Sequence, residues 1–215
     1  MDIVDPFRSA RLILELRQAG VMDNRVLSAI ERTPRAIFVP DEYRDMAYDN
    51  RQVPIACGQE LSLPVMVGRM VQALDVQAEH SVLEVGTGVG YQAAVLSLLA
   101  KRVYSIERFR TLHDMAKDTM TSLELNNVRL FHADGLDGLS DHAPFDRIIL
   151  TGAISLAPYK LAQQLNSGGI MVAPVEKDGF QHINVYKRIE NQVEKLTTLG
   201  PSKFLPLIIG AAREL

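Results

Sequence analysis

The sequence has few of the features that mark secreted or membrane-spanning proteins. Cys57 is the single cysteine among 215 residues, so no internal disulfide can form and a reducing compartment is expected. No apolar run approaches the roughly 20 residues that cross a bilayer. Asp2 and Asp5 stand where a secretory signal would carry basic residues. These absences predict a cytoplasmic protein with no membrane partner.

The sequence also lacks a surplus of basic charge. Its formal net charge is -3, and the densest basic pairing, Lys187-Arg188, is too short to form a patch. A sequence-independent interaction with nucleic acid phosphates is therefore not expected. The 5 histidines show no metal-ligand spacing, so no metal site is expected. With 47% hydrophobic residues, the composition is that of an ordinary globular protein.

The first third of the sequence is predicted to be helical and then irregular. Apolar residues recur at helical spacing over residues 7–21, and Gly20 is placed to end that helix. Asp23 can cap a second helix, which Pro34 would stop. From Phe38 to Pro64 the periodicity disappears, although interleaved apolar residues indicate packing; long segments of this kind are usually functional when ordered. Pro64 is well suited to the first turn of a third helix.

From Ser81 onward, strands and helices alternate. The predicted strands are Ser81–Val85, Arg102–Ile106, Val128–His132, Phe145–Leu150 and Gly169–Pro174, and the predicted helices cover about 91–100, 110–124 and 156–165. Most of these strands are nearly continuous apolar runs, as in a parallel sheet that is covered on both faces. The alternation predicts right-handed crossovers and a doubly wound α/β sheet.

The C-terminal part predicts an antiparallel edge. Residues His182–Arg188 and Gln192–Leu199 form a predicted hairpin that turns at Glu190-Asn191, and a short strand is expected near Phe204–Ile209. We therefore expect one compact unit. Residues 1–75 form a helical cap with a functional loop, packed on a Rossmann-like domain of residues 76–215.

A glycine-rich loop follows the first strand of the alternating region. The strand ends in Glu84 and continues into Gly86, Thr87, Gly88 and Gly90. Glycines permit positive φ angles and let a ligand approach the backbone. In open α/β sheets, ligands bind beyond the carboxyl ends of the strands. The sequence therefore predicts a cofactor site at this loop.

Two classes of cofactor compete for such a loop. A dinucleotide fingerprint reads G-x-G-x-x-G, whereas here the third glycine comes one residue early and Tyr91 takes its place. Glu84 would repel a pyrophosphate, but it favours a ligand with a cationic end. S-adenosylmethionine carries an ammonium and a sulfonium, so the loop favours this methyl donor.

Acidic residues after the next two strands support the same interpretation. Glu107 ends the second strand, where its two oxygens can accept both ribose hydroxyls. Asp134 follows the third strand and is placed to accept a hydrogen bond from the adenine amino group. Gly135 would let the purine lie against the backbone. With the glycine loop, these residues predict an adenosine site.

Over almost its whole length the sequence resembles the protein-L-isoaspartate O-methyltransferases. The resemblance rests on Arg32-Thr33-Pro34-Arg35, Phe38-Val39-Pro40, Ala47-Tyr48-Asp49-Asn50, Pro54-Ile55, Val82–Gly88 with Gly90-Tyr91-Gln92, Val103–Arg108, Ala143–Asp146, Gly168–Val172 and Phe204-Leu205-Pro206-Leu207. It implies a mostly parallel, seven-stranded class I methyltransferase sheet. It also implies methylation of the α-carboxylate of isoaspartyl residues in damaged proteins or peptides, which is a repair reaction.

The resemblance also implies where the acceptor binds. A family loop reading Ile-Gly-x-Gly-Gln-Thr-Ile-Ser-Gln-Pro is matched by residues 55–64, and Ser62 corresponds to the family's active-site serine. This loop departs from the family pattern at Ala56, Glu60 and Leu63. A negative charge at Glu60 would disfavour an incoming carboxylate. Two alternatives therefore stay open: a divergent paralogue that methylates a different acceptor, or a non-catalytic module that binds S-adenosylmethionine.

Overall fold

The computed structural model describes residues 6–155 and 158–212. Its N-terminal cap contains three helices, α1 (Pro6–Gln18), α2 (Asn24–Arg32) and α3 (Pro64–Leu74). The predicted caps are confirmed: the Asp23 side chain accepts a hydrogen bond from the Arg25 amide, and Pro64 occupies the first turn of α3. In the described part of the chain, no helix is both long and apolar enough to cross a membrane.

The segment between α2 and α3 is irregular but packed. It contains the 3-10 helices η1 (Arg35–Phe38), η2 (Asp41–Met46) and η3 (Ala56–Gly58), and a two-stranded ribbon of β1 (Val53–Pro54) and β2 (Glu60–Leu61). Val53 and Leu61 pair across this ribbon and are both buried. The prediction that apolar residues pack this segment is confirmed.

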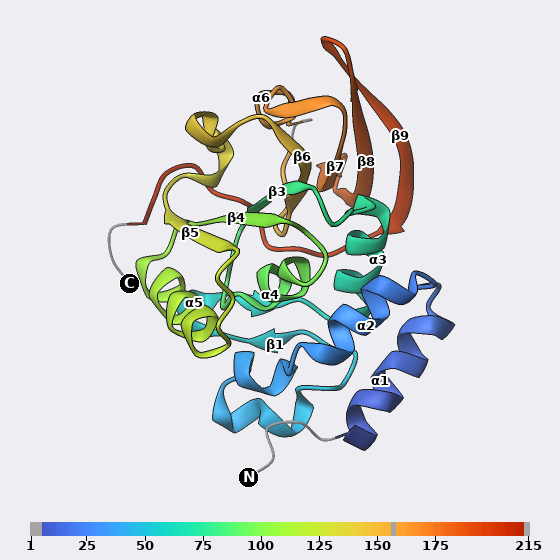
Figure 1. Cartoon of the computed structure of the whole chain (residues 1–215), viewed down its shortest axis with the longest axis vertical. Helices are drawn as coiled ribbons and strands as arrows, with labels where there is room; N and C mark the ends of the chain where they lie inside the picture. The colour runs from blue at the N-terminus through green and yellow to red at the C-terminus, as the bar shows by residue number, and fades with distance from the viewer. Residues whose placement is uncertain (1–5, 156–157, 213–215) are drawn as a thin grey trace.

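A seven-stranded sheet forms the body of the molecule (Figure 1). Its strands are β3 (Ser81–Val85), β4 (Arg102–Glu107), β5 (Val128–His132), β6 (Phe145–Leu150), β7 (Leu165–Lys177), β8 (Phe180–Ile189) and β9 (Gln192–Pro201). They lie in the order β5-β4-β3-β6-β7-β8-β9. The pairs from β5 to β7 are parallel, whereas β8 and β9 add antiparallel neighbours. The doubly wound sheet with an antiparallel edge is therefore confirmed.

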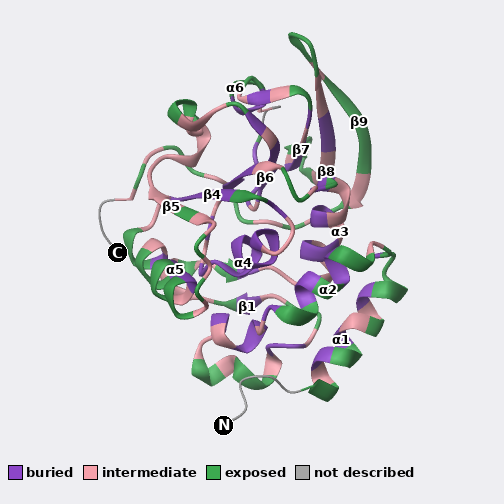
Figure 2. Cartoon of the chain, viewed as in Figure 1, coloured by how far each residue is buried: buried purple, intermediate pink, exposed green. Residues whose placement is uncertain are grey.

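The two faces of the sheet are covered unequally. Helices α4 (Tyr91–Ser97) and α5 (Arg110–Ser122) share one buried cluster with the cap helices and with sheet residues such as Val82. The opposite cluster is closed by α6 (Tyr159–Ala162), η4 (Gly135–Asp137), η5 (Ser140–His142) and loops. Figure 2 shows the buried residues concentrated along the central strands and α4. The predicted helix at 156–165 is shorter than expected, and residues 156 and 157 lie outside the described residues.

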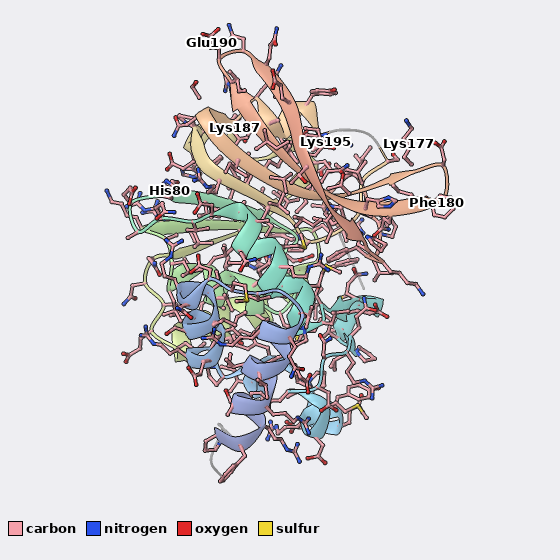
Figure 3. All side chains as sticks on the ribbon, turned by 90° about the vertical axis from the view of Figure 1, so that its right-hand side faces the viewer. His80, Lys177, Phe180, Lys187, Glu190 and Lys195 are labelled. Atoms are coloured by element: carbon pink, nitrogen blue, oxygen red, sulfur yellow. The ribbon has the colours of Figure 1, made fainter. Side chains whose placement is uncertain are left out.

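The antiparallel edge is a long twisted ribbon. In Figure 3, Lys177 and Phe180 flank the turn at one end, and Glu190 lies at the other. The hairpin between β8 and β9 turns at Glu190-Asn191, as predicted. The outer strand β9 is largely exposed and carries charged residues such as Lys195, which discourage further strand pairing.

The strand expected near Phe204–Ile209 does not form. Residues 204–212, which we call the C-terminal strap, instead cross the carboxyl ends of the parallel strands. They make isolated bridges only, Pro206 to Ala153 and Ala212 to Phe109. The segment crosses the strand ends instead of running along a sheet edge, and Pro206 has no amide to donate to a ladder. The prediction of a short strand was therefore wrong.

Candidate active site

A cavity of about 1070 Å³, counted with its open mouth, lies at the carboxyl ends of β3, β4 and β6. Its wall combines the glycine loop, the end of β4, loop 55–64 and the strap. Its lining includes Gln59, Glu60, Ser62, Gly86, Thr87, Gly88, Tyr91, Glu107, Gly135, Gly152, Leu205 and Leu207.

The glycine loop is held close to the strand beside it. Gly86 has φ +97°, and a Cβ there would lie 2.2 Å from Thr151 Oγ1. The Thr151 hydroxyl is directed at the main chain, since its oxygen lies 3.0 Å from the Val85 carbonyl oxygen. A side chain at position 86 would require the Thr151 hydroxyl to move, and the positive φ itself favours glycine. The loop thus presents bare backbone to the cavity.

Glu107 lies beside this loop and faces the cavity. Its Oε2 accepts a hydrogen bond from the Gly88 amide at 2.8 Å, and its Oε1 accepts one from the Phe109 amide at 2.9 Å. Burial raises the pKa of Glu107, while the backbone donors oppose that rise. Each carboxylate oxygen keeps a further lone pair. Glu107 can therefore fix the glycine loop and accept hydroxyl groups of a ligand.

Glu84 lies behind the glycine loop and is not part of the described cavity wall. It is fully buried, its Oε2 accepts a hydrogen bond from Ser105 Oγ at 2.5 Å, and the Gln92 side chain supplies a further polar contact. Burial raises the pKa of Glu84 from 4.5 to about 8. The Ser105 hydroxyl also contacts Thr87 Oγ1 at 2.6 Å, and Thr87 lines the cavity. Glu84 is thus connected to the cavity wall through the hydroxyls of Ser105 and Thr87.

Asp134 is engaged by the protein backbone. Its Oδ1 accepts a hydrogen bond from the Leu136 amide at 2.9 Å and caps η4, and its Oδ2 accepts one from the Gly210 amide at 2.7 Å. Asp134 is absent from the described cavity wall, whereas the adjacent Gly135 is part of it. In the structure, Asp134 holds the strap near the end of β5 through its hydrogen bond from the Gly210 amide.

Loop 55–64 brings Ser62 to the opposite wall. The Ser62 carbonyl accepts a hydrogen bond from Arg35 Nη2 at 2.7 Å. Cys57 takes a positive φ of 61° where the loop turns, and the Ile55 amide donates to the Gln59 carbonyl at 2.9 Å. Glu60 lines the cavity but is exposed to solvent. The structure therefore brings Ser62 into one cavity with Gly86, Thr87, Gly88, Glu107 and Gly135. Among the predicted residues, Gly90, Glu84 and Asp134 stay outside the wall.

Sequence reasoning missed the contribution of the strap and its support. Leu205 and Leu207 line the cavity, and Ala153 anchors them through paired backbone hydrogen bonds. A Cβ on Gly152 would lie 2.6 Å from Leu207 Cδ2. The signal that could have indicated the strap is Gly152 after β6, since a glycine at the end of a strand often marks a place where another segment of the chain approaches the backbone closely.

The fold and the cavity define a class of protein. A doubly wound sheet carries a glycine loop after β3, an acidic residue at the end of β4, and a ligand-sized cavity at the strand ends. These are the features of a class I S-adenosylmethionine-dependent methyltransferase.

Comparison with known proteins identifies the family. The family model described as Protein-L-isoaspartate(D-aspartate) O-methyltransferase (PCMT) matches residues 7–212. The protein-L-isoaspartate O-methyltransferase of Maricaulis maris is 46% identical over 215 residues, which is 100% of each chain. The protein of the same name from Rhodospirillum rubrum is 46% identical over 207 residues, covering 95% of this chain and 94% of the relative. The chain belongs to the protein-L-isoaspartate O-methyltransferase family.

Solved structures share the fold. A protein-L-isoaspartate O-methyltransferase superposes with a TM-score of 0.83 at 23% identity, covering 92% of this chain and 65% of the other. A Plasmodium falciparum structure described as an enzyme of this kind, in complex with S-adenosyl-L-homocysteine, has a TM-score of 0.79 at 20% identity and covers 92% and 97% of the two chains.

Proposed function

We propose that this protein transfers a methyl group from S-adenosylmethionine to the α-carboxylate of L-isoaspartyl residues in damaged proteins and peptides. The observation that carries the proposal is one cavity that joins Ser62 of loop 55–64 to the glycine loop and Glu107. We call the side with Gly86–Gly88, Glu107 and Gly135 the donor half, and the side with Gln59–Ser62 and the strap the acceptor half.

The donor half fits the cofactor of this family. The backbone at Gly86–Gly88 is open, and Glu107 retains acceptor capacity for ribose hydroxyls after binding two amides. Gly135 leaves room for a planar base. When bound, S-adenosylmethionine supplies an electrophilic methyl group on its sulfonium. Glu84 acts indirectly in this proposal, because its carboxyl contacts Ser105 instead of the cavity.

The acceptor half has a simple task. A carboxylate is already ionised at neutral pH, so no general base is required. The Ser62 hydroxyl donates a hydrogen bond to the carboxylate and orients it toward the donor half, which is a positioning role. Leu205 and Leu207 of the strap line the cavity and exclude water from the reacting groups.

The position of Glu60 favours the carboxylate acceptor over a different one. Its side chain is exposed, so water and salt screen its repulsion of an incoming carboxylate. The expected substrates are isoaspartyl proteins rather than nucleic acids, because a chain with a net charge of -3 has no general attraction for nucleic acid phosphates. The single Cys57 supports a cytoplasmic site of action. We keep the division into a cap of residues 1–75 and a domain of residues 76–215 as part of this proposal.

Label transfer tests the proposed function. The purified chain, given S-adenosylmethionine with a labelled methyl group, is expected to label an isoaspartyl peptide and not its aspartyl twin. The variant Ser62→Ala is expected to lose at least about tenfold in kcat/KM while binding S-adenosylhomocysteine as well as the parent does. Intact cofactor binding without transfer to the isoaspartyl peptide would overturn the proposal.

A further inference from the structure

Arg35 is a buried arginine for which the reaction described above has no role. It begins η1 within the segment Arg32-Thr33-Pro34-Arg35, and it is only 1% exposed. Arginine is almost never fully buried unless it is paired. The buried charge of Arg35 therefore calls for polar or charged partners within the fold.

The contacts of Arg35 leave its charge without a counter-ion. Nη2 donates to the Ser62 carbonyl at 2.7 Å, and the guanidinium carbon lies 4.5 Å from the centre of the Tyr91 ring. Within residues 6–155 and 158–212, Nε and Nη1 have no hydrogen-bond partner, and no carboxylate forms an ion pair with the guanidinium. One carbonyl and the Tyr91 side chain, which contacts the guanidinium through its ring and its hydroxyl, are thus its visible partners, and both are neutral.

A charge in this state is expensive to maintain. Desolvation of an ion costs more free energy than a cation–π contact returns, even when that contact is buried. Burial lowers the pKa of Arg35, and the nearby Tyr91 and Tyr48 side chains oppose that shift. Arginine nevertheless stays protonated in proteins. An anion bound nearby would supply the missing compensation.

Arg35 lies one layer behind the acceptor half of the cavity. Both residues that it contacts, Ser62 and Tyr91, line the cavity. The Tyr91 hydroxyl interacts with the Arg35 guanidinium and so links it to the cavity wall. In a buried environment, a charge acts over a longer distance and is weakly screened by salt.

The two halves of the cavity therefore differ in buried charge, since Glu60, the carboxylate of the acceptor half, is exposed to solvent. The Glu107 carboxylate lies in the donor half, where the cationic cofactor of the family would bind, and the Arg35 guanidinium lies behind the acceptor half. We propose that Arg35 is a positioning residue whose uncompensated charge, acting through the Ser62 and Tyr91 wall, makes the acceptor half selective for an anionic carboxylate. This inference rests on the proposed function, since it assumes that the acceptor is a carboxylate.

The proposal separates binding from chemistry. The carboxylate oxygen takes the methyl group as the bond between that methyl and the donor sulfur breaks, with the electron pair staying on sulfur, so the acceptor becomes a neutral ester. Arg35 thus stabilises the bound acid more than the ester. Its removal should raise KM without lowering the rate of the transfer step, and the charge should also favour release of the ester.

Paired ligands test the charge directly. Arg35→Met is compared with the parent for binding of two peptides to the S-adenosylhomocysteine complex by calorimetry: an isoaspartyl peptide and its α-carboxamide counterpart. We expect the preference for the carboxylate over the amide to fall about tenfold in Arg35→Met, with cofactor affinity unchanged. The control Arg51→Met removes an exposed arginine from the neighbouring segment and should leave the preference intact.

Two further variants distinguish charge from structure. Arg35→Gln keeps an amide donor for the Ser62 carbonyl without the charge, and it provides the test if the methionine variant does not fold. It should lose the preference, whereas Arg35→Lys should restore much of it. Equal weakening of both peptides, or an unchanged preference in Arg35→Gln, overturns the role of Arg35 while label transfer by the parent leaves the proposed function standing. A parent that binds the carboxylate no better than the amide overturns the role of Arg35, and absent label transfer is what overturns the function.

Discussion

The donor and acceptor halves of the cavity are built in different ways. The donor half stands on the ends of β3 and β4, where backbone amides fix Glu107 and a tight fit at Thr151 fixes Gly86. The acceptor half stands on an irregular loop, supported by the buried Arg35 from η1. A regular sheet thus fixes the part that is common to many methyltransferases, while an irregular segment carries the part that selects the acceptor.

Gly86→Ala should break the donor half with the largest effect. The new Cβ would meet Thr151 Oγ1 at 2.2 Å in a conformation of φ +97°. We expect a loss of about 2–5 kcal/mol in the free energy of unfolding and no binding of S-adenosylhomocysteine. Gly168→Ala is the matched control, because Gly168 has φ +82° with nothing within 4 Å of the new Cβ. Equal destabilisation in the two variants in urea unfolding would contradict the close fit.

Glu84→Gln tests how the buried carboxyl behind the donor half makes the free energy of unfolding depend on pH. The pKa of Glu84 is raised from 4.5 to about 8, so the folded chain keeps a proton that the unfolded chain loses in that window. Stability is full at low pH and is lost as pH rises toward 8, by up to about 1.4 kcal/mol per pH unit. Urea unfolding across this window should show the fall in the parent and its absence in Glu84→Gln. The control Glu42→Gln alters an exposed carboxylate and should keep the parent's slope.

Gly152→Ala tests the strap, which belongs to the acceptor half but also lies beside the donor half, since Leu207 Cδ2 would be 3.8 Å from a Cβ on Gly86. The added Cβ would lie 2.6 Å from Leu207 Cδ2 and 3.1 Å from the Leu205 carbonyl oxygen. We expect about tenfold weaker binding of S-adenosylhomocysteine and faster hydrogen exchange at the Leu207 amide, which donates to the Ala153 carbonyl. Adding Leu207→Ala should recover part of the affinity. An additive double variant would mean that the strap does not depend on this contact.

Glu60→Thr is the smallest expected change and concerns the acceptor half alone. Because Glu60 is exposed, removing its charge should improve affinity for an isoaspartyl peptide by no more than about threefold at low salt. High salt should abolish the gain. A gain of about a hundredfold, or the appearance of activity that the parent lacks, would revive the hypothesis of a different natural acceptor.

The donor half could be predicted from sequence because its signals are local. Glycines spaced after an apolar strand report backbone conformation, and Glu107 follows the next strand directly. The environment of Glu84 was harder to predict. Its place in the sequence shows that it is near the loop, but it does not show that its carboxyl is desolvated or hydrogen-bonded to Ser105. The hydrogen bond that Asp134 accepts from the Gly210 amide could not be predicted, because the two residues are distant in the sequence.

The acceptor half could be predicted only by resemblance. Loop 55–64 has no periodicity, so its ribbon and its turn at Cys57 follow from tertiary packing. The same applies to the strap, where a short apolar run is compatible with a strand until the path of the chain is known. Arg35 gave no signal of burial, since the residue type predicts an exposed side chain.

The strap also sets the time at which the cavity becomes complete during synthesis. Residues 204–212 follow all seven strands along the chain, yet they supply Leu205 and Leu207 to the cavity wall. A nascent chain can therefore assemble the sheet and the glycine loop before the cavity has this wall. Tight binding of a nucleoside ligand would then report that the strap has folded onto the strand ends, so ligand-dependent protection from a protease distinguishes chains with a docked strap from chains without one.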